Sequence, residues 1–192
     1  GKERVVMDTS DIQLPGVHNI ENYLAAIAAV DGMVSDEIIR DFARTFGGVE
    51  HRIELIRTLD GVRWYNDSIA SSPSRTIAGL RSFPEKVVLI AGGKDKGISY
   101  DSLGPVVNDH VKLLILCGAT AGVIRRAVEQ APNYAGLEIF DVADYEEAAA
   151  LARGRTQPGD VVMLSPASTS FDRFANFMER GRVFKDVVNR LQ

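Results

Sequence analysis

The 192-residue sequence has little of several features that mark particular classes of protein. It contains a single cysteine, Cys117, so a disulfide or a cysteine-based zinc site within the chain is excluded. No window approaches the roughly 20 apolar residues of a membrane helix, and the first residues lack a signal peptide's apolar stretch. The charge is balanced, with 22 Lys and Arg against 26 Asp and Glu, which argues against a nucleic-acid partner. These absences predict a cytoplasmic protein without a membrane or nucleic-acid partner.

The rest of the composition is that of an ordinary globular protein. Hydrophobic residues make up 45% and aromatic residues 7% of the sequence, and the length exceeds one average domain. Cys117 follows the apolar run 113–116 and is expected to be a small buried hydrophobe rather than a nucleophile. The chain begins without Met, on a short charged and β-branched stretch, which suggests that a preceding segment has been removed.

The hydrophobic pattern changes near residue 50. Before it we expect an extended stretch over 3–14, a helix over 19–30, and a second helix from the N-cap Ser35 to the glycines at 47–48. The apolar residues expected on the packing side of the first helix are Leu24, Ala25, Ile27, Ala28 and Val30. After residue 50, strands over 53–59 and 62–66 flank Asp60-Gly61, a dipeptide typical of a tight hairpin.

Strands and helices then alternate to the end of the chain. Strands are expected at 87–91, 112–117, 137–140 and 161–164, and helices at 73–82, 101–109, 120–131, 144–155 and 172–191. Alternation at this spacing favours parallel pairing with right-handed crossovers. The sequence therefore predicts an α/β fold, with a mostly parallel sheet flanked by helices and a hairpin at its start.

The loops that follow the predicted strands are the candidate ligand sites, because open α/β sheets bind ligands at the carboxyl ends of their strands. In the loop 66–73, Asp67 can accept hydrogen bonds from a sugar, although the loop can also serve only to cap the helix at Ser72-Pro73. The loop 92–97 brings two lysines to a strand end, which favours a carboxylate or phosphate partner over a solvated turn. No segment contains the Gly-Lys-Ser or Gly-Lys-Thr of a P-loop.

The loop 165–172 contains four hydroxyl groups within six positions. Such hydroxyls can donate hydrogen bonds to a carboxylate, although Ser170 or Asp172 can instead act simply as the cap of the last helix. The loop 118–122 lacks the complete GxGxxG spacing and is expected to be only a tight turn.

Five motifs, taken together and in this order, resemble the Mur ligases of peptidoglycan synthesis. The motifs are His18-Asn19-Ile20-Glu21-Asn22, His51-Arg52, Tyr65-Asn66-Asp67-Ser68, Gly92-Gly93-Lys94-Asp95-Lys96 and Leu164-Ser165-Pro166-Ala167-Ser168. The resemblance covers essentially the whole chain and implies an ADP-forming amide ligase of three domains. On that pattern, residues 1–50 are a helical remnant of the central ATPase domain and residues 51–192 are the complete C-terminal, Rossmann-like, amino-acid-binding domain. The absent P-loop would belong to the missing part of the central domain.

The resemblance also implies substrates and site residues. It is nearest to the branch of the family that joins D-glutamate to UDP-N-acetylmuramoyl-L-alanine with ATP and Mg²⁺, and the Mg²⁺ ligands would lie in the missing part of the central domain. The residues that match ATP-binding positions are Asn22 for adenine, Arg52 for the phosphates and Asp67 for the ribose. The residues that match D-glutamate-binding positions are Ser71, Lys96, Ser170, Phe171 and Phe177. Lys96 and Arg52 are the expected catalytic residues, and the protein is expected to be a monomer.

One departure from the family pattern concerns Ile69, which stands where many relatives have lysine. A contact from that lysine is either lost here or supplied by Lys94. Two other functions stay open: another ligase of the superfamily, such as a later Mur ligase or a folylpolyglutamate synthase, and a non-catalytic module that senses a nucleotide. The Asp-Asn-Pro-Arg signature of the diaminopimelate-adding relatives is absent. Without a P-loop, the fragment alone is expected to be inactive.

Overall fold

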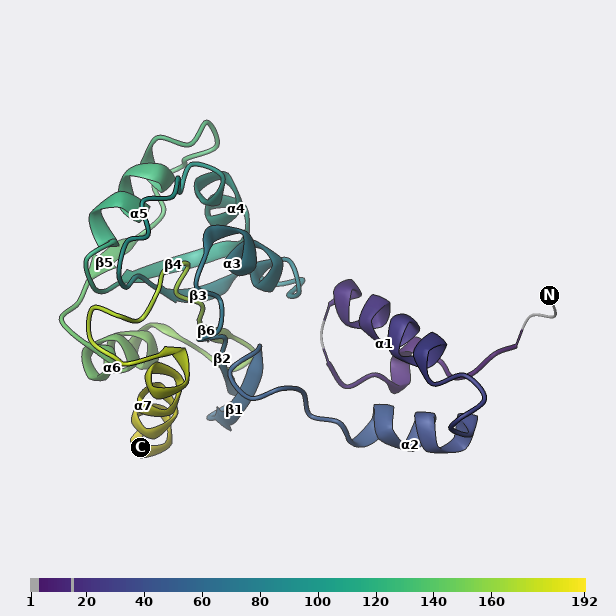
Figure 1. Ribbon diagram of the computed structural model, residues 1–192. Coiled ribbons are helices and arrows are strands. Elements are labelled where there is room, and N and C mark those ends of the chain that lie inside the picture. Colours follow the sequence, from purple (N-terminus) through teal and green to yellow (C-terminus); the bar gives the residue numbers. More distant parts are fainter. Residues whose placement is uncertain (1–3, 15) are drawn as a thin grey trace. The chain divides into compact units, whose positions relative to one another are not determined.

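The computed structural model describes residues 4–14 and 16–192 (Figure 1). The side chain of His18, which begins the first of the five motifs, lies outside the described part. The chain divides into two compact units, a first unit that ends at Gly48 and a second unit that extends from Val49 to Gln192. None of the helices in the described ranges is long and apolar enough to cross a membrane.

The first unit is built from two helices, α1 (Val17–Ala29) and α2 (Asp36–Thr45). Ser35 caps α2, as predicted, because its hydroxyl accepts a hydrogen bond from the Ile38 amide at 3.4 Å. The expectation of an extended stretch at the N-terminus is wrong over 9–11, where η1 (Thr9–Asp11) forms a turn of 3₁₀ helix. The Asp8 carboxylate accepts from the Ser10 amide at 2.8 Å, a local bond that competes with extended structure.

The packing side predicted for α1 is also largely wrong. Ile27 and Val30 are half-buried, but Ala25 and Ala28 are exposed and Leu24 is 63% exposed. The residues that this unit does bury are Asn19, Tyr23, Ile39 and Ala43. The apolar residues of α1 thus lie on a side that the described part of the first unit leaves uncovered.

The second unit is a six-stranded sheet in the order β1-β2-β6-β3-β4-β5. The strands are β1 (Glu54–Leu59), β2 (Val62–Asn66), β3 (Val87–Ala91), β4 (Val111–Leu116), β5 (Ile139–Asp141) and β6 (Val161–Leu164). β1 pairs antiparallel with β2, and every other neighbouring pair is parallel. Asp60 and Gly61 both have positive φ, 49° and 77°, as the predicted tight hairpin turn requires. The predicted fold class is confirmed.

Five helices cover the two faces of this sheet (Figure 1). They are α3 (Pro73–Leu80), α4 (Leu103–His110), α5 (Ala121–Glu129), α6 (Tyr145–Arg155) and α7 (Phe177–Arg190). Residues of α3, α4 and α5 pack into one core and residues of α6 and α7 into the other. Cys117 is buried in the second core, as expected, and burial raises the pKa of its thiol to about 11.

The last helix starts later than predicted, at Phe177 instead of 172. Its N-cap is Asn176, whose side chain accepts from the Glu179 amide at 2.9 Å, while the Glu179 carboxylate accepts from the Ala175 amide at 2.7 Å. The hypothesis that Ser170 or Asp172 caps this helix is therefore wrong. The residues before Asn176 form a loop that remains available to line a site.

Candidate functional site

The second unit brings three loops to one edge of its sheet. From β3 the chain continues outward through β4 and β5, whereas β6 returns to pair with the other side of β3. A reversal of strand order of this kind opens a crevice at the carboxyl ends of the strands. The loops after β2, β3 and β6 follow the carboxyl ends of these strands and contain most of the predicted site residues.

The loop after β3 is bound to the loop after β6 through Lys94 and Thr169. The Lys94 amide donates to the Thr169 carbonyl at 2.9 Å, and the Thr169 amide donates back at 3.2 Å. The Thr169 hydroxyl adds a third bond to the Lys94 carbonyl at 3.0 Å. At Gly93, which has φ 151°, a Cβ would lie 2.3 Å from the Thr169 carbonyl oxygen, so only glycine allows this approach.

Buried hydroxyl groups hold these two loops from below. The Thr120 hydroxyl accepts from the Gly93 amide at 3.0 Å and lies 2.8 Å from the Ser168 hydroxyl. The Tyr100 hydroxyl lies 2.9 Å from the same serine. Thr120 belongs to the loop 118–122, for which no chemistry was predicted, and its fully buried hydroxyl supports the two loops.

Arg180 connects the loop after β2 to the loop after β6, a role that the sequence analysis missed. The residue is 1% exposed, and its guanidinium donates to the Ser68 carbonyl at 2.7 Å, the Ser68 hydroxyl at 3.0 Å and the Ser168 carbonyl at 2.9 Å. No carboxylate of the described residues lies within ion-pair distance, and burial lowers its pKa. The available signal was its position between Phe177 and Phe184 on the packing side of an amphipathic helix, where a charged residue is unusual.

Asp67 is buried at the end of β2. Its carboxylate accepts hydrogen bonds from the Ser165 hydroxyl at 2.8 Å and from the Ile53 amide at 3.3 Å. Burial raises the pKa of Asp67 to about 7, against the opposing effects of these hydrogen bonds and of the nearby cations Arg52 and Arg75. Asp67 therefore joins β6 to the segment that carries Arg52, and its predicted contact with a ribose stays a prediction.

The five residues predicted to bind D-glutamate all belong to the second unit. Ser71, Lys96 and Ser170 lie in the three loops, and Ser170 is 3% exposed. Phe171 is 62% exposed, and Phe177 begins α7, where its carbonyl accepts from the Ser68 hydroxyl at 2.7 Å. Lys96 is exposed and makes no ion pair with any residue that the structure describes. The fold brings their loops together at one edge, and their contact with D-glutamate stays a prediction.

The residues predicted to bind ATP are divided between the units. Arg52 and Asp67 belong to the second unit, and Arg52 is exposed without an ion pair to any described residue. Asn22 is an exposed residue of α1 in the first unit, where its amide donates to Asn19 at 3.4 Å. Arg52 therefore lies near Asp67 within the second unit, and Asn22 belongs to the other unit.

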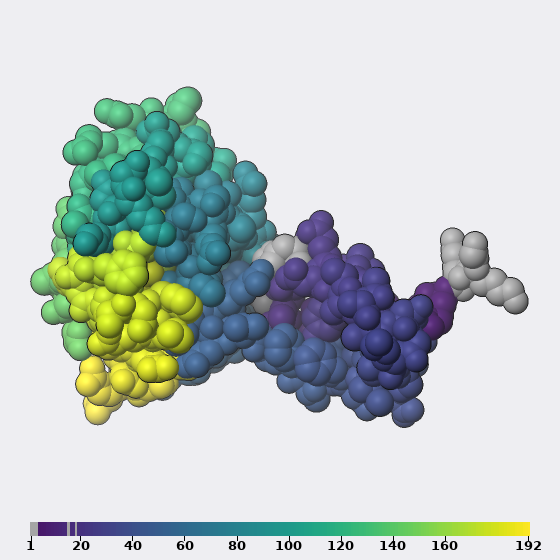
Figure 2. All heavy atoms as spheres, in the orientation of Figure 1, coloured from purple at the N-terminus to yellow at the C-terminus, as the bar shows by residue number. Residues whose placement is uncertain are grey.

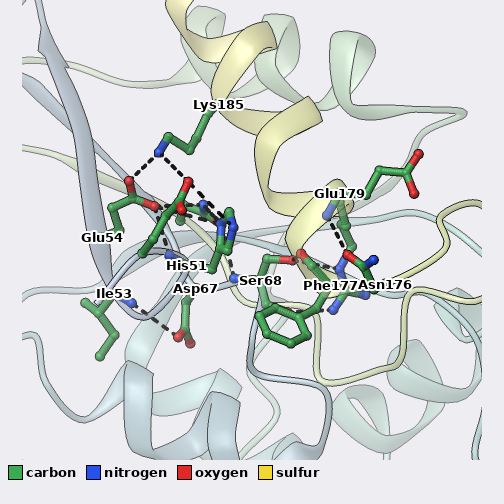
Figure 3. A network of polar contacts seen from close by, with 12 residues as sticks. His51, Ile53, Glu54, Asp67, Ser68, Asn176, Phe177, Glu179 and Lys185 are labelled. Atoms are coloured by element: carbon green, nitrogen blue, oxygen red, sulfur yellow. Dashed lines mark hydrogen bonds and ion pairs between the residues drawn. The ribbon is translucent and has the colours of Figure 1, made fainter. Parts of the chain in front are cut away.

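The segment 50–54 that carries Arg52 has an unusual backbone and a dense polar network (Figure 3). His51 and Ile53 both have positive φ, 68° and 46°, which is uncommon for residues other than glycine and strained for the β-branched Ile53. One Glu54 oxygen accepts from the His51 amide at 2.9 Å and from the Asn66 side-chain amide at 3.1 Å. Burial lowers the pKa of His51, whose ring is almost fully covered.

Glu50, His51 and Glu54 are the one group of described residues whose ligand atoms lie close enough to share a metal ion. Two observations argue against Mg²⁺ there. The Lys185 ammonium already lies 3.2 Å from Glu50 and 2.5 Å from Glu54. The side-chain carbonyl of Asn66 accepts from the Ser68 amide, so the NH₂ group of Asn66 faces His51 Nδ1. His51 Nδ1 therefore accepts a hydrogen bond, and the ring proton is on Nε2, so neither ring nitrogen is free to bind a metal. Mg²⁺ also prefers oxygen ligands and water, so these residues do not fit it.

Comparison with known proteins gives a consistent result. The family model described as "Mur ligase, glutamate ligase domain" matches residues 51–168. A protein of Acetivibrio thermocellus named "UDP-N-acetylmuramoylalanine--D-glutamate ligase" is 54% identical over 99% of this chain, which covers 42% of that protein. One of Symbiobacterium thermophilum with the same name is 50% identical over 100% of the chain and is also covered to 42%. The chain thus spans less than half the length of these curated relatives.

Solved structures share the fold at low sequence identity. UDP-N-acetylmuramate-alanine ligase MurC from Thermotoga maritima matches with a TM-score of 0.67 and 15% identity, over 91% of this chain and 38% of that one. Folylpolyglutamate synthase from Mycobacterium tuberculosis, complexed with ADP, matches with a TM-score of 0.65 and 13% identity, over 94% of this chain and 42% of that one. At these identities the likeness concerns the fold alone.

Proposed function

Because the chain belongs to the Mur ligase family, we propose that it is the C-terminal part of an ATP-dependent, ADP-forming ligase that adds D-glutamate to UDP-N-acetylmuramoyl-L-alanine. The observation that carries this proposal is that three loops lie together at one edge of the sheet. The Lys94–Thr169 hydrogen bonds join the loops after β3 and β6, and Arg180 joins the loops after β2 and β6. Identity of 50% or more with relatives of that name, over essentially the whole chain, supports this activity over other ligases of the family.

We further propose that residues 1–50 are the closing part of the central ATPase domain and that residues 51–192 are the amino-acid-binding domain. The boundary between the compact units at Gly48 and Val49 supports this division, as does a family match that begins at residue 51. A monomer that works in the cytoplasm, where ATP and a UDP-sugar are both present, belongs to the same proposal.

In the proposed complex, D-glutamate binds at the edge formed by the loops after β2, β3 and β6. An exposed lysine without an ion-pair partner, Lys96, supplies positive charge for a substrate carboxylate, and the Ser71 and Ser170 hydroxyls donate hydrogen bonds to it. Phe171 and Phe177 provide apolar surface for the carbon chain. Rigid support by buried groups keeps these loops in place before the substrate arrives.

The proposed reaction explains why cations are needed at this edge. A carboxylate oxygen of the UDP-sugar attacks the γ-phosphorus of ATP, ADP leaves, and an acyl phosphate forms. The D-glutamate amine then attacks the acyl carbon, loses a proton, and inorganic phosphate leaves as the amide bond is completed. Negative charge builds up in both steps, and fixed cations stabilise it. We assign that role to Arg52 at the phosphates and Lys96 at the amino acid, with Asn22 and Asp67 at the adenine and ribose and the Mg²⁺ ligands elsewhere in the longer protein.

The test uses D- and L-glutamate as paired probes. In NMR titrations of the chain, D-glutamate should shift amide signals of the loops at the sheet edge, and L-glutamate should bind at least about tenfold more weakly because its amine and carboxylate cannot both reach their partners. Lys96→Ala should abolish the D-glutamate shifts. Lys86→Ala is the matched control, because Lys86 precedes the same strand at its opposite end and should leave binding unchanged.

Two outcomes would contradict the proposal. Equal binding of the two enantiomers would favour a nucleotide-sensing module, and phosphate release by the longer protein that does not depend on D-glutamate would exclude this ligase. If the longer protein were a folylpolyglutamate synthase, its phosphate release would depend on a folate and L-glutamate instead.

A further inference from the structure

Lys185 of α7 reaches the segment that carries Arg52, and neither the motifs nor the proposed function account for it (Figure 3). Its ammonium lies 2.5 Å from one Glu54 oxygen and 3.2 Å from Glu50. The side chains of Lys185 and Glu54 are only 26% and 20% exposed, so this pair is better shielded from solvent than an ordinary surface ion pair. We propose that Lys185 is a positioning residue that holds residues 50–54 against α7 and thereby orients Arg52.

The segment needs such support because of its backbone. His51 and Ile53, on either side of Arg52, are both in the left-handed region, which is unfavourable for a β-branched residue above all. Conformations of this kind persist only where surrounding contacts fix them. Here the Ile53 amide donates to Asp67 at 3.3 Å and the His51 amide donates to Glu54 at 2.9 Å.

Glu54 transmits the effect of Lys185 to this backbone. One of its carboxylate oxygens meets Lys185, and the other accepts from the His51 amide and from Asn66. Without the ammonium, the carboxylate gains freedom to rotate toward solvent on the edge strand β1. The His51 amide would then lose its acceptor for part of the time.

The same side of α7 holds the His51 ring. A Cβ at Gly181 would lie 2.3 Å from His51 Nδ1, so the ring packs directly on the helix backbone. Lys185 is four residues after Gly181 and therefore lies one turn further along the same side. In the space-filling view, the yellow residues of α7 lie directly beside the blue residues that follow the first unit, in agreement with the contacts between α7 and β1 (Figure 2).

The first test is structural and independent of any function. In Lys185→Met, which keeps the aliphatic stem, hydrogen exchange of the His51 amide should be about two- to fivefold faster, which is the upper part of the range for exposed ion pairs, because this pair is better shielded. Lys185→Arg should restore the slow rate. Arg190→Met is the matched control on the same helix, because Arg190 pairs with Glu146 and not with the segment, and it should leave the rate unchanged. An unchanged rate in Lys185→Met would overturn the proposal.

The second test concerns Arg52 and rests on the proposed function. In the longer ligase that contains this chain, Lys185→Met should raise the KM for ATP about two- to fivefold and leave the KM for D-glutamate unchanged, with rescue by Lys185→Arg. Faster exchange together with an unchanged KM for ATP would show that Lys185 holds the segment but does not orient Arg52 for nucleotide binding. That result would overturn the second part of the proposal. An inactive wild-type ligase would contradict the proposed function, and the exchange experiment would still decide the role of Lys185.

Discussion

The two units of the chain differ in how completely they bury their apolar residues. In the second unit helices cover both faces of the sheet, and Trp64 and Phe184 are fully buried. In the first unit only four described residues are buried, while Leu24 is 63% and Phe42 is 53% exposed. Burial of apolar surface contributes about 25 cal/mol per Å² to folding. The second unit therefore has its own source of stability, and the described part of the first has little.

The polar groups differ in the same way. Arg180, Asp67 and Thr120 of the second unit are buried and hydrogen-bonded, so the loops that we propose for D-glutamate are fixed before any ligand binds. Asn22, the residue proposed for adenine, is an exposed side chain on a helix with incomplete packing. The part of the site proposed for D-glutamate is thus preorganised within the second unit, whereas the proposed adenine contact belongs to the first unit.

The largest expected effect comes from separating the units. Residues 49–192 alone should unfold cooperatively in urea, with Trp64, the one tryptophan, as the fluorescent probe. Residues 1–48 alone should lose most of their helix, because helices of 13 and 10 residues are marginal in water without a covered apolar side. Far-UV circular dichroism of both pieces checks this. Cooperative thermal unfolding of residues 1–48 would contradict the comparison.

Matched phenylalanine substitutions should give the next largest effect. Phe184→Ala in the second unit should lower the free energy of unfolding by about 3–5 kcal/mol, because it leaves a cavity between α7 and the sheet. Phe42→Ala in the first unit should cost at most about 1 kcal/mol, since that ring is half exposed and mainly stacks on Phe46. Urea titrations monitored by circular dichroism measure both changes. Equal losses would show that the first unit has a core of its own.

Local signals account for the parts of this fold that the sequence predicted well. Asp60-Gly61 fixed the hairpin because both positions need positive φ, and the limits of β3 and β6 were predicted to the residue because short apolar runs end at glycine or serine. The start of α7 was missed because Phe174 continues the helical spacing toward the N-terminus. The capping pair Asn176 and Glu179 was visible three residues apart, and the apolar pattern outweighed it.

The site was predictable only as a set of loops. Gly92–Lys96 and the other motifs could be recognised as stretches of sequence, and topology then placed them at one edge. Arg180 and Lys185 could not be found in this way, because their roles depend on contacts with residues more than 100 positions away. The packing side of α1 was mispredicted for a related reason. An apolar pattern indicates that one side of a helix can be buried, but it does not indicate that the surface that would cover this side is present.

The smallest expected effect concerns pH and again distinguishes the units. Because burial raises the pKa of Asp67 from 3.8 to about 7, the folded state holds a proton there that the unfolded state has already lost between these values. The contribution of Asp67 to stability is therefore fully present below pH 3.8 and is lost as the pH rises through 7. Between pH 5 and 8 the free energy of unfolding should fall by about 2 to 3 kcal/mol. Urea titrations of residues 49–192 at several pH values measure it.

Asp67→Asn mimics the protonated carboxyl and should remove this decrease, because the amide keeps an acceptor for Ile53 and a donor for Ser165. Asp8 in the first unit should act in the opposite direction. Hydrogen bonds from Ser10 lower its pKa, so its small contribution is present above pH 3.8 and is lost as the pH falls. If the Asn variant kept the full decrease between pH 5 and 8, Asp67 would be charged in the folded state. The anchor of the Arg52 segment would then be an ordinary carboxylate.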